Sequence, residues 1–124
     1  MAILGLGTDI VELARFENMS EAGLQRLAKR VLTPTELTVF EQHARPARYL
    51  AKRFAVKEAA SKALGTGIGN GISFQHFESS NNSLGAPQLV FCGEAKQRLP
   101  LHANVWVSIS DEKHYAVATV IIDG

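Results

Sequence analysis

The chain has 124 residues, with 13 Lys and Arg against 12 Asp and Glu, which leaves a formal net charge of +1. Hydrophobic residues make up 46% and charged residues 20%, a balance typical of one globular domain spanning residues 1–124 and not of a disordered chain. The near-neutral charge gives no reason to expect a nucleic-acid partner, and the single cysteine, Cys92, excludes an internal disulfide and a thiolate zinc site.

The first predicted element is a strand over residues 3–11, whose apolar and β-branched residues are interrupted by Gly5 and Gly7. Asp9 continues the face of these glycines because side chains alternate along a strand. The first basic residue is Arg15, so no positive charge precedes the apolar run and we expect no signal peptide. No apolar run approaches the roughly 20 residues that span a bilayer. We therefore expect a cytoplasmic protein with no membrane partner.

Helical spacing of apolar residues, capping residues and helix breakers predict four helices in the first half of the chain. They cover residues 12–19, 21–31, 34–45 and 47–64. The third has the clearest start, because Thr33 and Glu36 suit a capping box with Pro34 at the first helical position. The fourth ends at Gly65, which opens a loop with four glycines within residues 65–71.

The second half of the chain is richer in predicted strands. They cover residues 72–78, 88–92, 105–110 and 115–122, with a short helix at 93–99 after the second. Residues 111–114 join the last two strands as a hairpin. Because helices cluster early and strands late, the predicted fold class is α+β, with the helices packed on a small, mainly antiparallel sheet.

The helix over residues 47–64 carries the charges most relevant to chemistry. Glu58 shares a side with Phe54, and a carboxylate on a partly buried face needs a proton, an ionic partner or a metal. An ordinary i,i+4 pair with Lys62 is one interpretation, and a metal site is the other. Six of the 13 basic residues lie between positions 45 and 62. Either they form a solvated face, or two or three of them converge on a substrate with several phosphates.

Asp9 is the second acidic residue of interest. It is either a turn residue at the end of a strand or a partner of Glu58 in holding a hard cation. Two carboxylates about 4 Å apart repel by several kcal/mol at an intermediate dielectric. Mg²⁺ offsets that repulsion and typically binds one or two carboxylates together with substrate phosphate oxygens and water.

Three segments carry a family resemblance: Gly-Leu-Gly-Thr-Asp-Ile at 5–10, Arg-Phe-Ala-Val-Lys-Glu-Ala-Ala-Ser-Lys at 53–62, and Gly-Thr-Gly-Ile at 65–68. Together they resemble the short bacterial 4′-phosphopantetheinyl transferases, the holo-[acyl-carrier-protein] synthase family. Phe-x-x-Lys-Glu-x-x-x-Lys downstream of Gly-x-Asp is more specific than either motif alone. The resemblance implies an enzyme that transfers phosphopantetheine from coenzyme A to a serine of apo acyl carrier protein and releases adenosine 3′,5′-bisphosphate.

The resemblance also implies roles for the charged residues of the motifs. Asp9 and Glu58 would hold Mg²⁺, while Glu58 and Lys62 would act in catalysis, with Lys62 on the coenzyme A phosphates. Displacement at a pyrophosphate phosphorus needs charge neutralisation more than a protein nucleophile. The serine nucleophile belongs to the carrier, which explains why the sequence shows no catalytic triad. Glu58, a metal-bound hydroxide and another water stay open as the base.

Further residues are implied to contact the two substrates. Those near the nucleotide end of coenzyme A would be Arg53, Gly65, Thr66 and Gly67. Arg15 matches a position that contacts the acidic helix of the carrier protein. We expect Arg26 to extend this basic surface, an inference that rests only on its positive charge. Family members often carry His after the Val-Ser-Ile-Ser strand, where this chain has Asp111. An acid cannot donate to a phosphate as His⁺ can, so we expect Asp111 to hold a water or a basic side chain.

Members of the family assemble as homotrimers with active sites between subunits. The predicted strand over 115–122 is apolar on both faces, which suits either a helix-covered sheet or a subunit interface. Two other functions fit the same residues. One is a non-catalytic adaptor that holds an acidic protein or a nucleotide on its basic helix, and the other is a different metal-dependent phosphotransferase that uses the same two acids.

Overall fold

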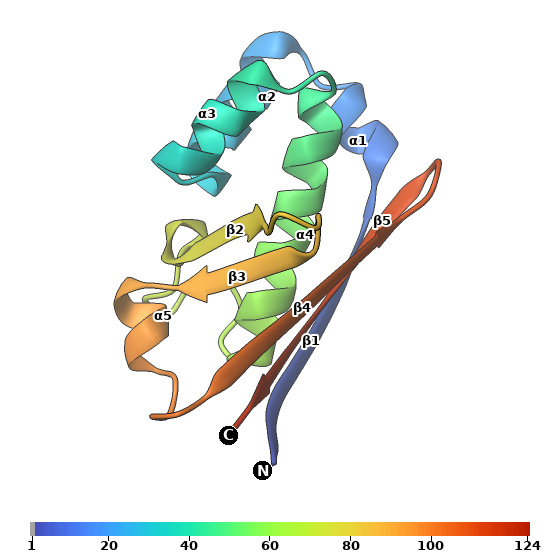
Figure 1. The fold of residues 1–124 in the computed structure, drawn as a ribbon. Coiled ribbons are helices and arrows are strands. Elements are labelled where there is room, and N and C mark those ends of the chain that lie inside the picture. The colour runs from blue at the N-terminus through green and yellow to red at the C-terminus, as the bar shows by residue number, and fades with distance from the viewer. Residues whose placement is uncertain (1) are drawn as a thin grey trace.

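A three-stranded antiparallel sheet and a long helix, α4, form the frame of the computed structural model, which describes residues 2–124 (Figure 1). The sheet has the order β1-β5-β4, and its strands are β1 (Ile3–Glu12), β4 (Asn104–Asp111) and β5 (Tyr115–Asp123). A separate antiparallel pair consists of β2 (Phe77–Asn81) and β3 (Pro87–Phe91). The sequence predicts one small sheet; the structure divides its strands between two.

The helices come mainly from the first half of the chain, as predicted, and the α+β class is confirmed. They are α1 (Leu13–Glu17), α2 (Glu21–Val31), α3 (Pro34–Gln42), α4 (Pro46–Ala63) and α5 (Gly93–Gln97). The helix α4 packs against β1 and β5, while α1, α2 and α3 pack around its first half (Figure 1). Within residues 2–124 no helix combines the length and the apolar character needed to cross a membrane.

The prediction of a strand over residues 72–78 is wrong for most of that segment. Phe74–His76 form a 3₁₀ turn, η1, and β2 begins only at Phe77. The imidazole Nδ1 of His76 accepts a hydrogen bond from the Ser73 amide at 3.1 Å. A side chain that satisfies a backbone donor locally allows a turn where the apolar pattern alone suggests a strand.

A buried ion pair joins four elements of the fold. Lys57 on α4 is completely buried; its Nζ is 2.5 Å from Glu36 Oε1 and donates to the Val31 carbonyl at 2.7 Å. The same Glu36 oxygen accepts from the Thr33 amide in the predicted capping box, and the other accepts from the Ser79 amide at 2.6 Å. The pair therefore connects the end of α2, the start of α3, α4 and β2. Lys57 is not available to a substrate.

The closest approach in the frame is between β1 and α4. A Cβ atom on Gly7 would lie 1.9 Å from the Ala59 carbonyl oxygen, and one on Gly5 would lie 2.0 Å from that of Ala63. Both distances are far below van der Waals contact, so only glycine permits this packing. Asp9 is the next residue of β1 on the same face, which directs its side chain to α4.

Gly7→Ala is expected to destabilise the protein by more than about 2 kcal/mol, because the new methyl must push β1 away from the α4 backbone. Gly23→Ala on α2 is the matched control: its new Cβ would meet side-chain atoms alone, the Ser20 hydroxyl at 3.0 Å and Arg26 Nη2 at 3.9 Å, and alanine favours helix. Urea unfolding of both variants measures the difference. Equal midpoints for Gly7→Ala and the wild type would contradict the close packing.

Candidate active site

The predicted site residues of β1 and α4 do come together. Lys62 lies on the last turn of α4, and its Nζ is 3.1 Å from Asp9 Oδ1 and 3.0 Å from the Thr8 carbonyl oxygen. Glu58 is one turn earlier on the same helix. Lys62 therefore pairs with an acid across the β1–α4 contact, and the interpretation of Lys62 as a simple i,i+4 partner of Glu58 is wrong.

The environment of Glu58 is that of a carboxylate sharing a site with a second acid. Partial burial raises the pKa of Glu58, the negative charge of Asp9 raises it further, and Lys62 opposes both effects. Asp9 is also sheltered, with 18% of its side chain exposed, whereas Lys62 is half exposed. Two acids share one electrostatic environment with a single ammonium group, which leaves an excess of negative charge.

This donor set fits a magnesium ion. Asp9 and Glu58 present hard carboxylate oxygens, and within residues 2–124 no three His, Cys, Asp or Glu side chains gather as a metal site. A structural zinc ion would need about four protein ligands. Mg²⁺ binds through one or two carboxylates when a substrate supplies phosphate oxygens. The pair therefore fits Mg²⁺ as a cofactor that shares its coordination with a phosphate-bearing substrate.

The glycine loop closes the C-terminal end of α4 beside these residues. The amide of Gly65 donates to the Lys62 carbonyl at 2.9 Å, and those of Thr66 and Gly67 donate to the Ser61 carbonyl at 3.2 and 3.1 Å. Gly65 and Gly67 have φ values of 82° and 67°, which favour glycine. The three amides thus cap the helix, and what the loop offers a ligand is open space beside the backbone at Gly65 and Gly67.

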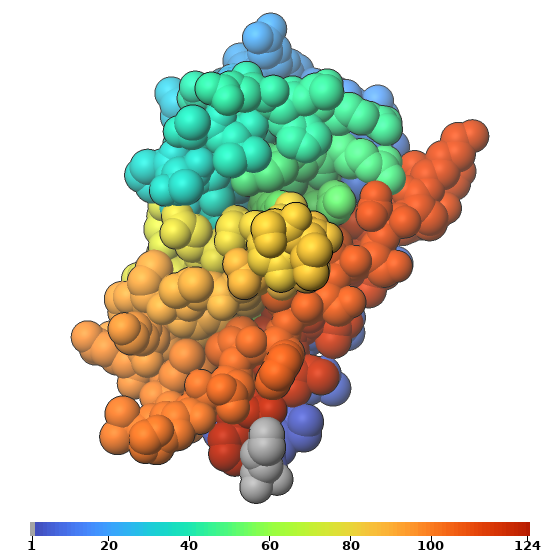
Figure 2. Space-filling view, viewed as in Figure 1, coloured from blue at the N-terminus to red at the C-terminus, as the bar shows by residue number. Residues whose placement is uncertain are grey.

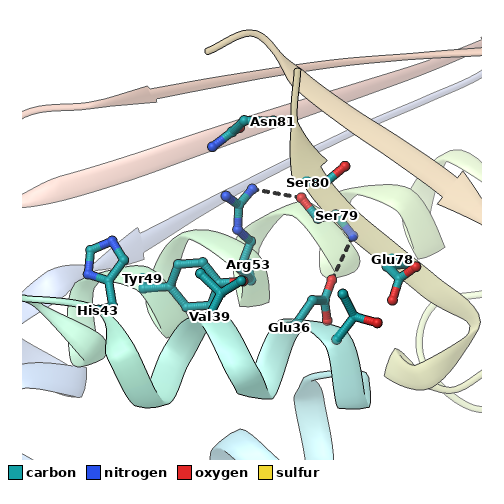
Figure 3. A pocket seen from close by; sticks show the side chains of 10 residues that line it. Glu36, Val39, His43, Tyr49, Arg53, Glu78, Ser79, Ser80 and Asn81 are labelled. Atoms are coloured by element: carbon teal, nitrogen blue, oxygen red, sulfur yellow. Dashed lines mark hydrogen bonds between the residues drawn. The ribbon is translucent and has the colours of Figure 1, made fainter. Parts of the chain in front are cut away.

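Arg53, the other residue predicted at the nucleotide end, points away from the two acids. It is 6% exposed; its Nη1 donates to Ser79 Oγ at 2.7 Å, and its guanidinium lies 5.0 Å from the centre of the Tyr49 ring. Its Nε is buried without a partner. Arg53 lines a cavity of about 490 Å³ between α3, α4 and β2, which Asp9, Glu58 and Lys62 do not line (Figure 3).

Two partners of Arg53 escaped the sequence analysis. Tyr49 precedes Arg53 by four residues, so helical spacing indicates that they share a face. Ser79 is brought to Arg53 by the packing of β2 on α4, and nothing local in the sequence signals that contact. Figure 3 shows the guanidinium extending from α4 toward Ser79, with Asn81 beyond it.

The expectation that Asp111 holds a basic side chain is confirmed. Arg48 Nη2 donates to Asp111 Oδ2 at 2.7 Å, and Lys52 Nζ lies 3.6 Å from Asp111 Oδ1. The Arg48 hydrogen bond is the main cause of an Asp111 pKa below its usual range. Arg15 on α1 and Arg26 on α2, the residues predicted to bind the carrier, are both exposed.

The chain matches the 4′-phosphopantetheinyl transferase superfamily over residues 5–120. A protein of Alteromonas mediterranea named holo-[acyl-carrier-protein] synthase is 62% identical over 125 residues, covering 99% of this chain and 98% of that protein. The solved holo-[acyl-carrier-protein] synthase of Neisseria meningitidis has a TM-score of 0.85 at 40% identity, covering 99% of this chain and 100% of that one. That of Bacillus anthracis, in complex with CoA (3′,5′-ADP), has a TM-score of 0.80 at 39% identity, covering 97% and 96%.

The Glu58 carboxyl is expected to titrate above the range of an ordinary glutamate in metal-free protein, because burial and Asp9 both disfavour its charged form. Asp9→Asn should lower this pKa, since it removes the like charge and frees Lys62 to approach Glu58. Carboxyl-carbon NMR across the acid range measures the shift, with Glu41→Gln on the exposed surface of α3 as the control. An unchanged Glu58 pKa in Asp9→Asn would show that the two acids do not interact.

Proposed function

The chain belongs to the 4′-phosphopantetheinyl transferase superfamily, a family of transferases, and we propose that it moves 4′-phosphopantetheine from coenzyme A to a serine of apo acyl carrier protein. The observation that carries the proposal is the meeting of Asp9, Glu58 and Lys62 at the β1–α4 contact. The relative from A. mediterranea bears the name of this activity, and the similar B. anthracis structure is in complex with CoA (3′,5′-ADP). Adenosine 3′,5′-bisphosphate is the second product.

The site residues suit displacement at a pyrophosphate phosphorus. The carrier serine oxygen forms the new bond to the phosphorus of phosphopantetheine, the bond from that phosphorus to the bridging oxygen breaks, and the serine proton is released. Asp9 and Glu58 would hold Mg²⁺, which when bound would supply charge neutralisation at the phosphates. Lys62 is half exposed and already beside Asp9, so it can donate to a phosphate oxygen and stabilise the charge that develops on the leaving group.

The proposed binding surface for the carrier begins where β1 ends. Arg15 lies on α1, directly after the strand that holds Asp9, and Arg26 lies on α2, the next helix. Both side chains are exposed. A basic surface beside the site attracts an acidic partner and orients it, an effect that falls with ionic strength. The carrier would dock there with its serine toward Asp9 and Glu58.

We propose that the chain forms a homotrimer, in which the uncovered face of the three-stranded sheet lies between subunits. One face of β5 packs on α4 through Ala116, Ala118, Val120 and Ile122, whereas the opposite face of the sheet carries exposed apolar side chains. Leu6 pairs with Ile121 of β5, which in turn pairs with Trp106, so the three form a row across that face. Leu6 is 62% and Trp106 58% exposed. Burial of this row between subunits would remove apolar area from water.

Leu6→Glu is expected to convert the trimer to monomers, because it places a charge in the apolar row. Sedimentation velocity at micromolar concentration measures the mass. Val39→Glu is the matched control, since it makes the same kind of change at an exposed apolar residue on α3 and leaves the sheet untouched. A monomeric wild-type protein, or a Leu6→Glu trimer, would overturn the proposed assembly.

The proposed reaction is tested by weighing the carrier after incubation with the protein, Mg²⁺ and coenzyme A. A mass gain of one phosphopantetheine, abolished by a chelator, is expected. Asp9→Asn and Glu58→Gln should each lower turnover at least about 100-fold, the scale of losing one electrostatic stabiliser, with the fold retained. Glu41→Gln on α3 is the control and should act as the wild type.

The other outcomes separate the alternative functions. Carrier binding without a mass gain, unaffected by Asp9→Asn, would favour the adaptor. Metal-dependent cleavage of other phosphate compounds without modification of the carrier would favour a different phosphotransferase. Chromatography of the reaction mixture checks that adenosine 3′,5′-bisphosphate appears in step with the modified carrier.

A further inference from the structure

A single arginine ties the glycine loop, residues 65–71, to the helix α5. Arg98 directly follows α5; its Nη2 donates to the Asn70 carbonyl at 2.6 Å, and its Nε donates to Glu94 Oε1 at 3.1 Å. Glu94 lies one turn earlier on α5, so the helix holds the guanidinium and the guanidinium holds the loop. Figure 2 shows α5 (orange) at the surface of the molecule, and in Figure 1 it lies beside the C-terminal half of α4.

The backbone of the glycine loop is costly to hold in one conformation. Positive φ values recur along it at Gly65, Gly67, Gly69, Asn70 and Gly71. A Cβ atom placed on any of the first three glycines would meet no atom within 4 Å. Glycine loses more conformational freedom on ordering than any other residue, and open surroundings supply few contacts to offset that loss. A hydrogen bond from outside the loop therefore contributes much of its order.

Arg98 holds the loop at the tip of a tight turn. Gly69 and Ile72 exchange backbone hydrogen bonds of 2.8 and 2.9 Å, which leaves Asn70 and Gly71 as the two central residues. Positive φ at both positions is typical of a type I′ turn. A Cβ on Gly71 would lie 2.9 Å from Arg98 Nη2, so the guanidinium lies directly against this turn.

Asn70 connects the turn to the cap of α4. Its Nδ2 donates to the Thr66 carbonyl at 3.4 Å, while the amides of Thr66 and Gly67 donate to the Ser61 carbonyl. Ser61 directly precedes Lys62 on the last turn of the helix. A continuous series of hydrogen bonds thus leads from α5, through the loop, to the end of α4 that carries Lys62.

We propose that Arg98 is a positioning residue, which holds the glycine loop in the conformation that receives coenzyme A. The inference rests on the proposed function, which places the coenzyme A phosphates at Lys62, three residues before the loop. Backbone without side chains at Gly65 and Gly67 lets a ligand approach closely. A loop that is already ordered loses less conformational entropy on binding, so the tether increases the affinity for coenzyme A. Arg98 takes no part in the chemical step.

Arg98→Ala should raise KM for coenzyme A about 10-fold, the scale of losing one hydrogen bond to a charged group, and leave kcat unchanged. Arg98→Lys keeps a cationic donor and should restore part of the loss. Lys96→Ala is the matched control, because it removes an exposed cation from α5 itself and should leave both constants as in the wild type. A fall in kcat at constant KM, or an equal effect of Lys96→Ala, would overturn the inference.

Amide hydrogen exchange in the ligand-free protein tests the tether itself. In Arg98→Ala the amides of Thr66 and Gly67 should exchange about 10-fold faster, because the loop opens more readily. The Val120 amide, on the central strand β5, should exchange as in the wild type. Equal acceleration at Val120 would show that the substitution weakens the whole fold, which would contradict a positioning role.

Asn70→Gly tests whether the constraint passes through Asn70. It keeps the positive φ and the carbonyl that Arg98 binds, and it removes the side-chain contact with Thr66. Because Arg98 and Asn70 act through one series of hydrogen bonds, the combined variant should raise KM by less than the product of the two single effects. A full product would show that the two residues act independently and would refute the series.

Calorimetry separates failure of this inference from failure of the proposed function. Coenzyme A is titrated into the wild type, Arg98→Ala and Lys96→Ala in the absence of a carrier protein. Weaker binding by Arg98→Ala alone supports the inference even if the carrier is never modified. Equal binding by all three proteins, or no binding by the wild type, overturns the inference. Binding without transfer to the carrier counts against the proposed function only.

Discussion

Direct contact between the β1 backbone and the α4 backbone is the constraint on which the site depends. Gly5 and Gly7 let the strand lie against the carbonyl oxygens of Ala63 and Ala59, closer than any residue with a Cβ allows. At that separation the short side chain of Asp9 reaches the ammonium group of Lys62, 3.1 Å away. The glycines two and four residues earlier are therefore part of the acidic site, although they carry no functional group.

The rotation of α4 is fixed from its other side by the buried Lys57–Glu36 pair. Consecutive helical residues point about 100° apart, so anchoring Lys57 in the core turns Glu58 toward β1. Phe54, on the same helix as Lys57, packs on Phe16 of α1 and Phe74 of η1. The segment Phe-x-x-Lys-Glu-x-x-x-Lys thus has two roles. Its Phe54 and Lys57 pack the helix into the core, and its Glu58 and Lys62 belong to the site.

The features that the sequence predicted correctly are those that depend on interactions between residues close together in the chain. The capping box of Thr33 and Glu36 and the glycine C-cap after α4 were predicted because both satisfy backbone groups within a few residues. The grouping of Asp9 with Glu58 and Lys62 in one site needed family resemblance, and the direct contact of Asp9 with Lys62, 53 residues away, was not predicted. The contact of Arg53 with Ser79 was not predicted, because it depends on how a strand of the second sheet packs on α4.

The six basic residues around α4 look uniform in the sequence, but the fold divides them among five partners. Arg45 pairs with Glu17 of α1, Arg48 and Lys52 with Asp111 of β4, Arg53 with Ser79 of β2, Lys57 with Glu36 of α3, and Lys62 with Asp9 of β1. The cations thereby tie five elements to one helix. Positive charge beyond that of the partners remains at Arg48 and Lys52, which share one carboxylate, and at Arg53, whose partner is a hydroxyl; the half-exposed Lys62 also keeps donors for a phosphate. Binding capacity on this helix therefore follows from the arrangement of its acidic partners and not from the number of its basic residues.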